Sequence, residues 1–417
     1  MRSAIRLMVG QALVSRVSAA AELVALNWWV FHATGSSAMV GAVTLARLVP
    51  LAVAGPWLGA RADRVEPTRL LAAVLSVGAV MTVLMACVMT VLMACVMYVQ
   101  GEGASIRGVW MVVVAVAVRA VVTSAEPAIR NATVAAMSGS GELMSAMASL
   151  SLVITLSLVV GPALAGVLMA AGGSALVVAL CGAGYAVAAV SSLALPRVST
   201  PPAAAPSSSA ATPWRTAIRV VGDHPRLGAQ LVIAAGPMLC VFPYTAMMPV
   251  IAHTLFADDA QRGIAILSAA GGVGAVIGAV LMKKVLATPP AVLAVGAAIA
   301  LTLPTVFLAV IAALPKMIIL GAVCVCLLGF VGQLYRTSNR TATLLLAPDE
   351  HKGLFAGISQ TDRVLIPAGA FLLGFVADHW GVVVMAAVMA VGNAVLILPA
   401  LFLIARNKNV ASSDVLD

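Results

Sequence analysis

Long apolar segments follow one another along almost the whole chain. Each is about as long as the roughly 20 residues that a helix needs to cross the hydrocarbon core of a membrane. Only 9% of the 417 residues are charged, so a soluble fold would have to expose a continuous apolar surface. The sequence therefore predicts an all-α membrane protein with twelve transmembrane helices. The predicted spans are 9–32, 37–60, 70–99, 109–130, 143–170, 174–196, 228–252, 262–282, 290–312, 317–340, 353–377 and 381–404.

The polar segments between these spans differ in their content of basic residues. If the N-terminus is cytoplasmic, most of the 24 Lys and Arg residues fall in cytoplasmic segments, whereas the external segments hold Arg107, Arg262 and Lys316. Because basic residues favour the cytoplasmic side of a membrane, this pattern predicts that both termini are cytoplasmic. The net charge of +9 then reflects topology, and we expect the lipid bilayer and no nucleic acid among the partners.

A stretch rich in Pro, Ala and Ser separates the first six spans from the last six. Residues 197–217 read RVSTPPAAAPSSSAATPWRTA, a composition typical of a flexible linker. The halves also resemble each other, since Arg130-Asn-Ala-Thr133 and Arg340-Thr-Ala-Thr343 end the fourth and tenth spans. Parallel repeats of this kind are typical of transporters. We predict a six-helix bundle over 1–196, a cytoplasmic linker over 197–227 and a second six-helix bundle over 228–417.

Four charged residues lie within predicted spans of the first half: Arg16, Glu22, Arg47 and Arg119. A charge at the centre of a bilayer costs about 2.5–3.5 kcal/mol on insertion scales, so each needs a partner or a function. Glu22 is the carboxylate at the predicted depth of Arg47 and Arg119. It either carries a proton between the two sides or forms a fixed ion pair with one of these arginines, and both interpretations stay open.

Three arginines against one carboxylate leave an excess of positive charge in the predicted membrane interior. This excess favours a substrate with carboxylate, catecholate or phosphate groups, and we assign Arg16, Arg47 and Arg363 to the substrate cavity. Alternatively, backbone carbonyls and waters satisfy Arg16 and Arg47. In the eleventh span, Asp362 and Arg363 either neutralise each other or line the cavity opposite Glu22, where Asp362 would join in proton coupling.

The loop at 59–71, GARADRVEPTRLL, resembles the loop between helices 2 and 3 of the major facilitator superfamily, written G-x-x-x-D-R-x-x-[RK]. Its form is close to that of the drug/proton antiporter branch with the enterobactin exporter and macrolide-efflux proteins. The resemblance implies two six-helix bundles that expose a central cavity to each side in turn. It implies gating contacts in which Asp63 meets Arg130 and the start of the eleventh span. The residues expected to take part in gating are Gly59, Asp63, Arg64, Arg69, Arg130 and Arg340.

Two further segments carry the same resemblance. Gly161-Pro162-Ala-Leu-Ala-Gly166 is similar to the antiporter motif GPxxGG of helix 5, which in the family goes with export. Arg119 resembles an arginine of helix 4 that is linked to proton coupling, although the Gln and Gly that usually follow it are absent here. Related efflux proteins often carry an acid at the position of Glu22, which adds to its interpretation as a proton carrier.

The sequence thus predicts a proton-driven exporter of small organic molecules in the bacterial inner membrane, functional as a monomer. A siderophore-like metabolite and amphipathic drugs are the leading substrates. Uptake of an organic anion is the alternative, because the excess of arginine suits it equally. Catalytic, metal-binding and nucleotide-binding motifs are absent from the sequence, so we expect no enzymatic activity, no cofactor and an ion gradient as the driving force.

Overall fold

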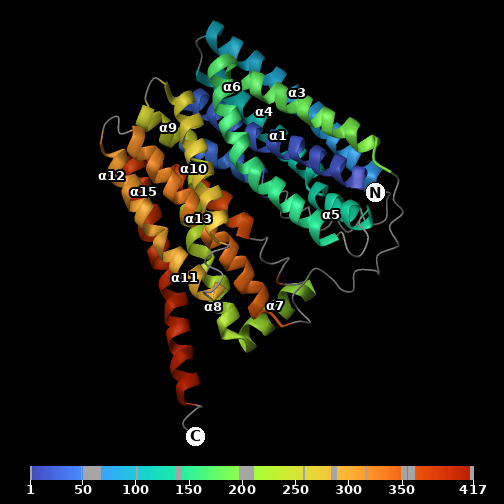
Figure 1. Cartoon of the computed structure of the whole chain (residues 1–417). Coiled ribbons are helices and arrows are strands. Elements are labelled where there is room, and N and C mark those ends of the chain that lie inside the picture. The colour runs from blue at the N-terminus through green and yellow to red at the C-terminus, as the bar shows by residue number, and fades with distance from the viewer. Residues whose placement is uncertain are drawn as a thin grey trace. The chain divides into compact units, whose positions relative to one another are not determined.

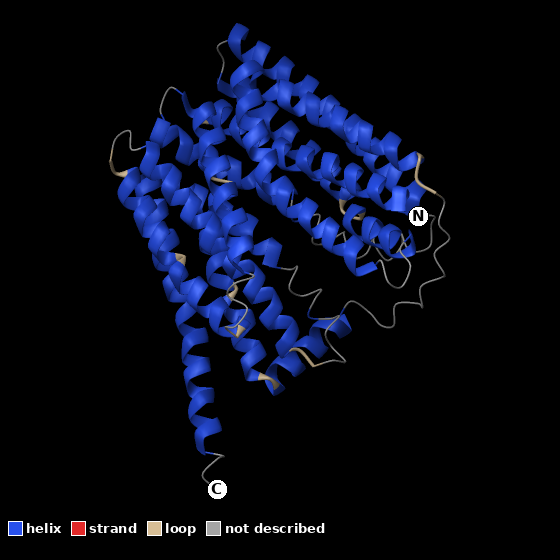
Figure 2. Ribbon diagram, in the orientation of Figure 1, coloured by secondary structure: helices blue, strands red, loops and turns tan. Residues whose placement is uncertain are grey.

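A computed structural model shows an almost entirely helical chain (Figure 2), with no strand among the residues that it describes. This confirms the predicted all-α class. The described residues are 2–47, 49, 67–99, 102–137, 143–196, 211–256, 259–282, 289–314, 318–348, 355 and 362–413.

The contacts between Cα atoms divide the chain into two compact units. One comprises Met1–Pro206 and Asp258–Ala269, and the other comprises Ser207–Ala257 and Ala270–Asp417. The first unit holds α1 (Arg2–Thr34), α3 (Pro67–Val99), α4 (Glu102–Thr123), α5 (Glu126–Met137), α6 (Leu143–Leu193) and the first part of α10 (Ala260–Met282). Within it, α1 and α3 both pack along α6, and α3 also packs against α4 (Figure 1).

The second unit contains the rest of α10 and the later helices. They are α7 (Ala211–Asp223), α8 (Pro225–Ile233), η1 (Pro237–Val241), η2 (Phe242–Thr245), α9 (Met248–Phe256), α11 (Pro290–Ala300), α12 (Thr302–Ala312), α13 (Ile318–Leu346) and α15 (Asp362–Ser413). α11 packs on α13, and α15 packs on α12, α8 and η1. The amphipathic α7 buries Ala217 and Val220 against Leu227 of α8, next to Phe355.

Eight helices among the described residues are long and apolar enough to cross a membrane. Two of them, α6 and α15, are each broken at a glycine and hold two predicted spans. The shorter apolar helix Gly108–Thr123 lies in the fourth predicted span, and a helical stretch at 37–47 begins the second. The described residues therefore include all or part of each predicted span, the second only over 37–47 and 49.

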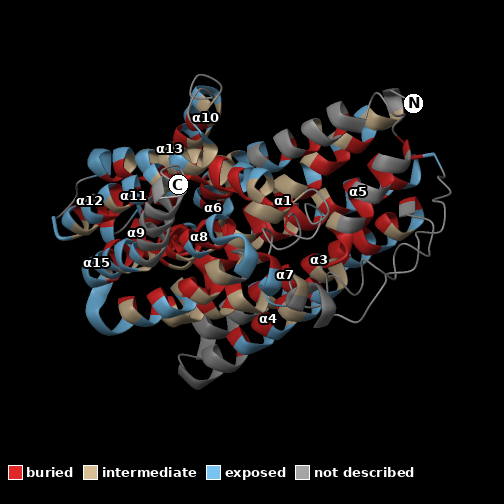
Figure 3. Ribbon diagram, turned by 90° about the horizontal axis from the view of Figure 1, so that it is seen from below, coloured by how far each residue is buried: buried red, intermediate tan, exposed pale blue. Residues whose placement is uncertain are grey.

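The faces of α4 show why this fold requires lipid. Val109, Val112 and Val116 are buried, whereas Met111 and Val114 on the same helix are 62% and 58% exposed. Figure 3 shows this mixture of buried and exposed residues on the helices of the chain. A helix that is apolar on both its packed and its exposed face is typical of a membrane span, so the chain is a multi-pass membrane protein.

The seventh predicted span is not one regular helix. It begins as α8, continues as a π-helix and a 3₁₀ helix through η1 and η2, and resumes as α9. Pro237, Pro243 and Pro249 recur through it, and each removes one backbone donor from the helical ladder. The apolar pattern predicted the span, but it did not predict these local changes of helix type.

Glycines with positive φ divide the two longest helices. Gly173 in α6 has φ 77° and ψ 174°, and Gly381 in α15 has φ 82° and ψ 169°. This backbone region is essentially restricted to glycine. The two positions lie between the fifth and sixth and between the eleventh and twelfth predicted spans, so both halves of the chain turn back in the same way.

We expect Gly381→Ala to lower the free energy of unfolding by about 1–3 kcal/mol, the usual cost of a strained backbone conformation. A Cβ atom at Gly381 would have no neighbour within 4 Å, so the loss would come from the backbone alone. Denaturant unfolding of the purified protein in detergent measures it. Gly296→Ala in α11 is the matched control, because its Cβ would also be free within 4 Å but its helical φ suits alanine. Equal stability of the two variants would contradict the prediction.

Candidate functional site

Glu22 and Arg119 form a buried ion pair between α1 and α4. Nη1 of Arg119 lies 2.9 Å from Oε1 of Glu22, and the two residues are 5% and 0% exposed respectively. Although this is an ion-pair distance, Oε1 of Glu22 and Nε of Arg119 make no hydrogen bond of good geometry in the described structure. The attraction between the two groups is therefore mainly Coulombic.

Tyr185 of α6 contacts both members of this pair. Its hydroxyl donates a hydrogen bond to Oε2 of Glu22 at 3.0 Å. Its ring lies beneath the guanidinium of Arg119, with Cζ 4.7 Å from the ring centroid, a distance typical of a cation–π interaction. Tyr185 is itself buried, so one side chain connects α1, α4 and α6.

Arg47, from the helical stretch 37–47, interacts electrostatically with two residues of α6 at this site, Tyr185 and Cys181. Nη2 of Arg47 donates to the carbonyl oxygen of Ala19 at 2.8 Å. Its Nη1 is buried and makes no hydrogen bond among the described residues. A buried guanidinium donor without a partner is costly, so this atom is a candidate for binding a water or an anionic group.

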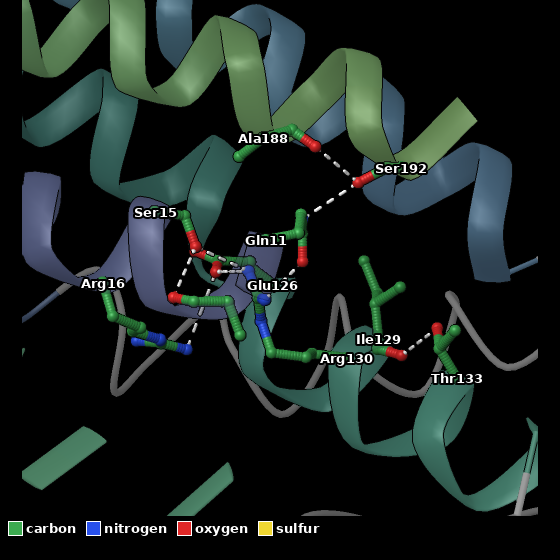
Figure 4. Close-up of polar contacts among 10 residues, drawn as sticks. Gln11, Ser15, Arg16, Glu126, Ile129, Arg130, Thr133, Ala188 and Ser192 are labelled. Carbon is green, nitrogen blue, oxygen red and sulfur yellow. Dashed lines mark hydrogen bonds and ion pairs between the residues drawn. The ribbon is translucent and has the colours of Figure 1, made fainter. Parts of the chain in front are cut away.

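A second buried cluster forms around Arg130 of α5 (Figure 4). Nη2 of Arg130 donates to Glu126 Oε1 at 2.6 Å and to Ser15 Oγ at 2.9 Å, and Nη1 donates to Gln11 Oε1 at 2.7 Å. Glu126 and Arg130 are spaced by one helical turn and therefore share a face of α5. The bonds to Gln11 and Ser15 hold α5 against α1, and the bond to Glu126 fixes the guanidinium within α5.

Arg16 belongs to this second cluster rather than to the Glu22 pair. Its Nη2 lies 3.7 Å from Glu126 Oε1. Gln11 extends the cluster to α6, because its amide donates to Ser192 Oγ at 2.9 Å (Figure 4). Arg16 and Glu22 are six residues apart, which is about 240° around a helix at 100° per residue, so they point in different directions.

The segment that resembles the antiporter motif packs closely on neighbouring backbone. A Cβ atom on Gly161 would come within 2.5 Å of Ala20 Cβ and 2.9 Å of the Val17 carbonyl oxygen of α1. On Gly166 it would meet Ala265, which belongs to the same unit, at 2.5 Å. Pro162 lies inside α6 between them. The motif thus lets α6 approach α1 more closely than a residue with a side chain would allow.

The remaining predicted site residues have diverse surroundings. Arg69 and Arg340 are exposed, and Gly59, Asp63 and Arg64 lie outside the described residues. Asp362 and Arg363 begin α15, and their side chains are outside the described part. Within that part, no three His, Cys, Asp or Glu side chains are grouped as metal ligands would be.

Sequence reasoning missed Tyr185, Gln11, Ser15 and Ser192, although a signal existed. Polar residues recur on α1 at 11, 15, 18 and 22, and Cys181, Tyr185 and Ser192 recur on α6 with similar spacing. Both sets follow the i, i+4, i+7, i+11 pattern of a single helix face. The contacts Gln11–Ser192 and Glu22–Tyr185 show that the two stripes meet in antiparallel order.

Comparison with known proteins finds similarity to several membrane transporters. The chain is 25% identical over 380 residues to the staphyloferrin A transporter of Staphylococcus aureus (strain NCTC 8325 / PS 47), covering 89% of this chain and 88% of the relative. Among solved structures it resembles the nucleoside transporter NupG, with a TM-score of 0.75, 13% identity and coverage of 96% of this chain and 99% of that one. It also resembles a bacterial homologue of the iron transporter ferroportin in an inward-facing state, with a TM-score of 0.69, 13% identity and coverage of 97% and 99%.

At these identities the solved structures establish the fold alone, which is the fold predicted from the sequence. The model of the Major Facilitator Superfamily matches residues 9–368, most of the chain. With its paired six-helix pattern and buried charges, the chain belongs to the major facilitator superfamily of membrane transporters.

Proposed function

We propose that this protein exports small organic molecules in exchange for protons, with Glu22 as the residue that binds the proton. The observation that carries the proposal is the difference between the two buried carboxylates. Glu126 lies within ion-pair distance of two arginines, Arg130 and Arg16, whereas Glu22 pairs with Arg119 and otherwise accepts a hydrogen bond from the neutral Tyr185. A nearby cation favours the charged form of a carboxylate, so a carboxylate held by one arginine is better suited to take and release a proton than one held by two.

The proposed direction and substrate rest on further features. The resemblance of Gly161-Pro162 and Gly166 to the antiporter motif favours export. The name of the staphylococcal relative supports a siderophore-like metabolite, with amphipathic drugs as the other candidates. Nη1 of Arg47, buried without a partner, favours an anionic group on the substrate, and it equally suits the alternative of a symporter that takes up an organic anion.

Several finer assignments remain part of the proposal. We place the protein in the bacterial inner membrane as a monomer, with both termini in the cytoplasm and the bundles divided at 197–227. Arg130, already bound to Glu126 and Gln11, is proposed to release some of these contacts for Asp63 during gating. Asp362 is proposed as a second protonatable group.

The proposal predicts that Glu22→Gln abolishes accumulation driven by a pH gradient. In inside-out vesicles with an acidic lumen, a one-proton exchanger should accumulate its substrate about tenfold per pH unit, because one pH unit corresponds to about 1.4 kcal/mol. We expect wild type to accumulate staphyloferrin A without iron or a fluorescent amphipathic drug, and Glu22→Gln to reach only the ratio found without a gradient.

Asp259→Asn is the matched control, since it makes the same carboxylate-to-amide change in an exposed surface pair with Arg262. It should behave as wild type. Gradient-driven accumulation by Glu22→Gln equal to wild type would exclude Glu22 as the proton carrier. Movement of the substrate out of the acidic lumen would instead favour the uptake alternative.

A further inference from the structure

We infer that Tyr185 is a positioning residue that holds both Glu22 and Arg119 in place when protonation of Glu22 removes the attraction between them. This inference rests on the proposed function, because it concerns the same proton site. It adds a residue on α6 to a site for which the sequence had indicated Glu22, Arg119 and Asp362.

The first step is the state in which Glu22 is charged. Arg119 Nη1 then lies 2.9 Å from Oε1, and the Tyr185 hydroxyl donates to Oε2 at 3.0 Å. The two partners thus use different oxygens of one carboxylate. The phenol holds the oxygen that the arginine leaves free, and the carboxylate plane is fixed from two sides.

The second step is the state in which Glu22 carries a proton. The carboxyl group is then neutral, and its Coulombic attraction to Arg119 is lost. A phenol hydroxyl can donate or accept a hydrogen bond, so Tyr185 can bind the carboxyl group in both protonation states. Arginine has donors only, so it can donate to the carbonyl oxygen of the neutral group but cannot accept a hydrogen bond from its O–H.

The third step concerns Arg119, which stays buried and charged when its partner is neutral. A buried cation without any partner is strongly unfavourable. The ring of Tyr185 lies 4.7 Å from Arg119 Cζ, and this contact does not depend on the charge of Glu22. A cation–π contact is strongest when the guanidinium is desolvated, so this contact partly offsets the loss of the ion pair.

The other charged and titratable groups around the site do not duplicate this role. Arg47, on the stretch 37–47, and Cys181, one turn before Tyr185 on α6, act electrostatically on the same phenol. Glu126 of α5 acts electrostatically on Arg119, but its own hydrogen bond comes from Arg130. The Arg47 side chain donates a hydrogen bond to the Ala19 carbonyl oxygen. Among the described residues, Tyr185 is therefore the side chain that contacts both members of the pair directly.

Infrared difference spectroscopy of the full chain in proteoliposomes tests the inference without a known substrate. A titration with pH should reveal the carbonyl band of protonated Glu22, identified by its loss in Glu22→Gln. In Tyr185→Phe this band should move to higher frequency, because the carboxyl group loses the hydrogen bond of the phenol while the ring remains. Tyr335→Phe, which removes the hydroxyl of another buried tyrosine in the second unit, should leave the band unchanged.

The outcomes separate the two proposals. A Glu22 band that Tyr185→Phe does not move would overturn the role of Tyr185 and leave the proton site standing. A wild-type protein with no band that depends on Glu22 at any pH would overturn the proton site itself.

Transport measurements add a second test. Tyr185→Phe should reduce the initial rate of gradient-driven transport of the drug or siderophore about tenfold or more, as expected for the loss of a hydrogen bond to a charged group. Exchange of the same substrate across vesicles without a gradient should change far less. Equal losses of driven transport and exchange would mean that Tyr185 serves only packing and would overturn the inference.

The ring has its own test in Tyr185→Leu. Because leucine also removes the cation–π contact with Arg119, driven transport should fall further than in Tyr185→Phe. If the two variants behave alike, the part of the inference that assigns Arg119 to the ring is wrong.

Discussion

Arg119→Leu is expected to destabilise the protein by about 3–5 kcal/mol and to abolish gradient-driven transport. Removing one partner of a buried ion pair leaves an uncompensated charge, and this has a cost of that size. Glu22, fully buried, would keep only the hydrogen bond from Tyr185. Unfolding by denaturant measures the loss of stability, and the vesicle assay measures the loss of transport.

The double variant Glu22→Gln/Arg119→Leu separates stability from function. Because it removes both charges, we expect its stability to recover to within about 2 kcal/mol of wild type, while transport stays absent. Arg262→Leu is the surface control, since it removes an arginine from an exposed pair and should change stability by less than about 0.5 kcal/mol. A stable Arg119→Leu variant would show that the pair is not buried as described.

Arg130→Leu is expected to cost a similar amount, about 3–5 kcal/mol, for a different reason. It removes the donor that connects α5 to α1, and it leaves Glu126 with Arg16 alone, at 3.7 Å. Gln11 Oε1 and Ser15 Oγ would also lose their donor. The free energy of unfolding in detergent measures the effect.

Arg340→Leu is the matched control for the stability of Arg130→Leu. Arg340 occupies the matching position of the second half, in Arg340-Thr-Ala-Thr343, but its side chain is exposed. We expect Arg340→Leu to change stability by less than about 0.5 kcal/mol. If Arg130→Leu and Arg340→Leu lower the free energy of unfolding equally, the buried contacts of Arg130 do not contribute the stability that we assign to them.

Arg130 and Arg340 show that matching motifs in the two halves do not imply matching surroundings of the side chain. Both arginines end a span in the same short motif, and in both halves the threonine three residues later bonds to the carbonyl oxygen one turn earlier. Four residues before Arg130 stands Glu126, whereas Arg336 stands four residues before Arg340. Opposite charges on one helix face attract and like charges repel, so the different burial of the two arginines could have been expected from the sequence.

Tyr185 shows the opposite case. A single tyrosine in an apolar span is usually a core or interface residue, and its spacing from Glu22 in the sequence carries no information about contact. Only the close approach of α6 to α1, permitted by Gly161 against Ala20 and Val17, brings the phenol to the carboxylate. The polar stripes on the two helices indicated which faces are buried but not which residues would meet.

The sequence by itself determined the membrane fold, the twelve spans and the family, because apolar length, turn glycines and short motifs are local properties of the chain. It also placed Glu22, Arg47 and Arg119 at a common depth, since depth follows from counting residues along a helix. The tertiary structure alone decided that Arg119 pairs with Glu22, that Arg16 faces Glu126 and that Tyr185 contacts both members of the buried pair. These choices depend on helix rotation and on the distance between helices, which are set by the packing of many side chains together.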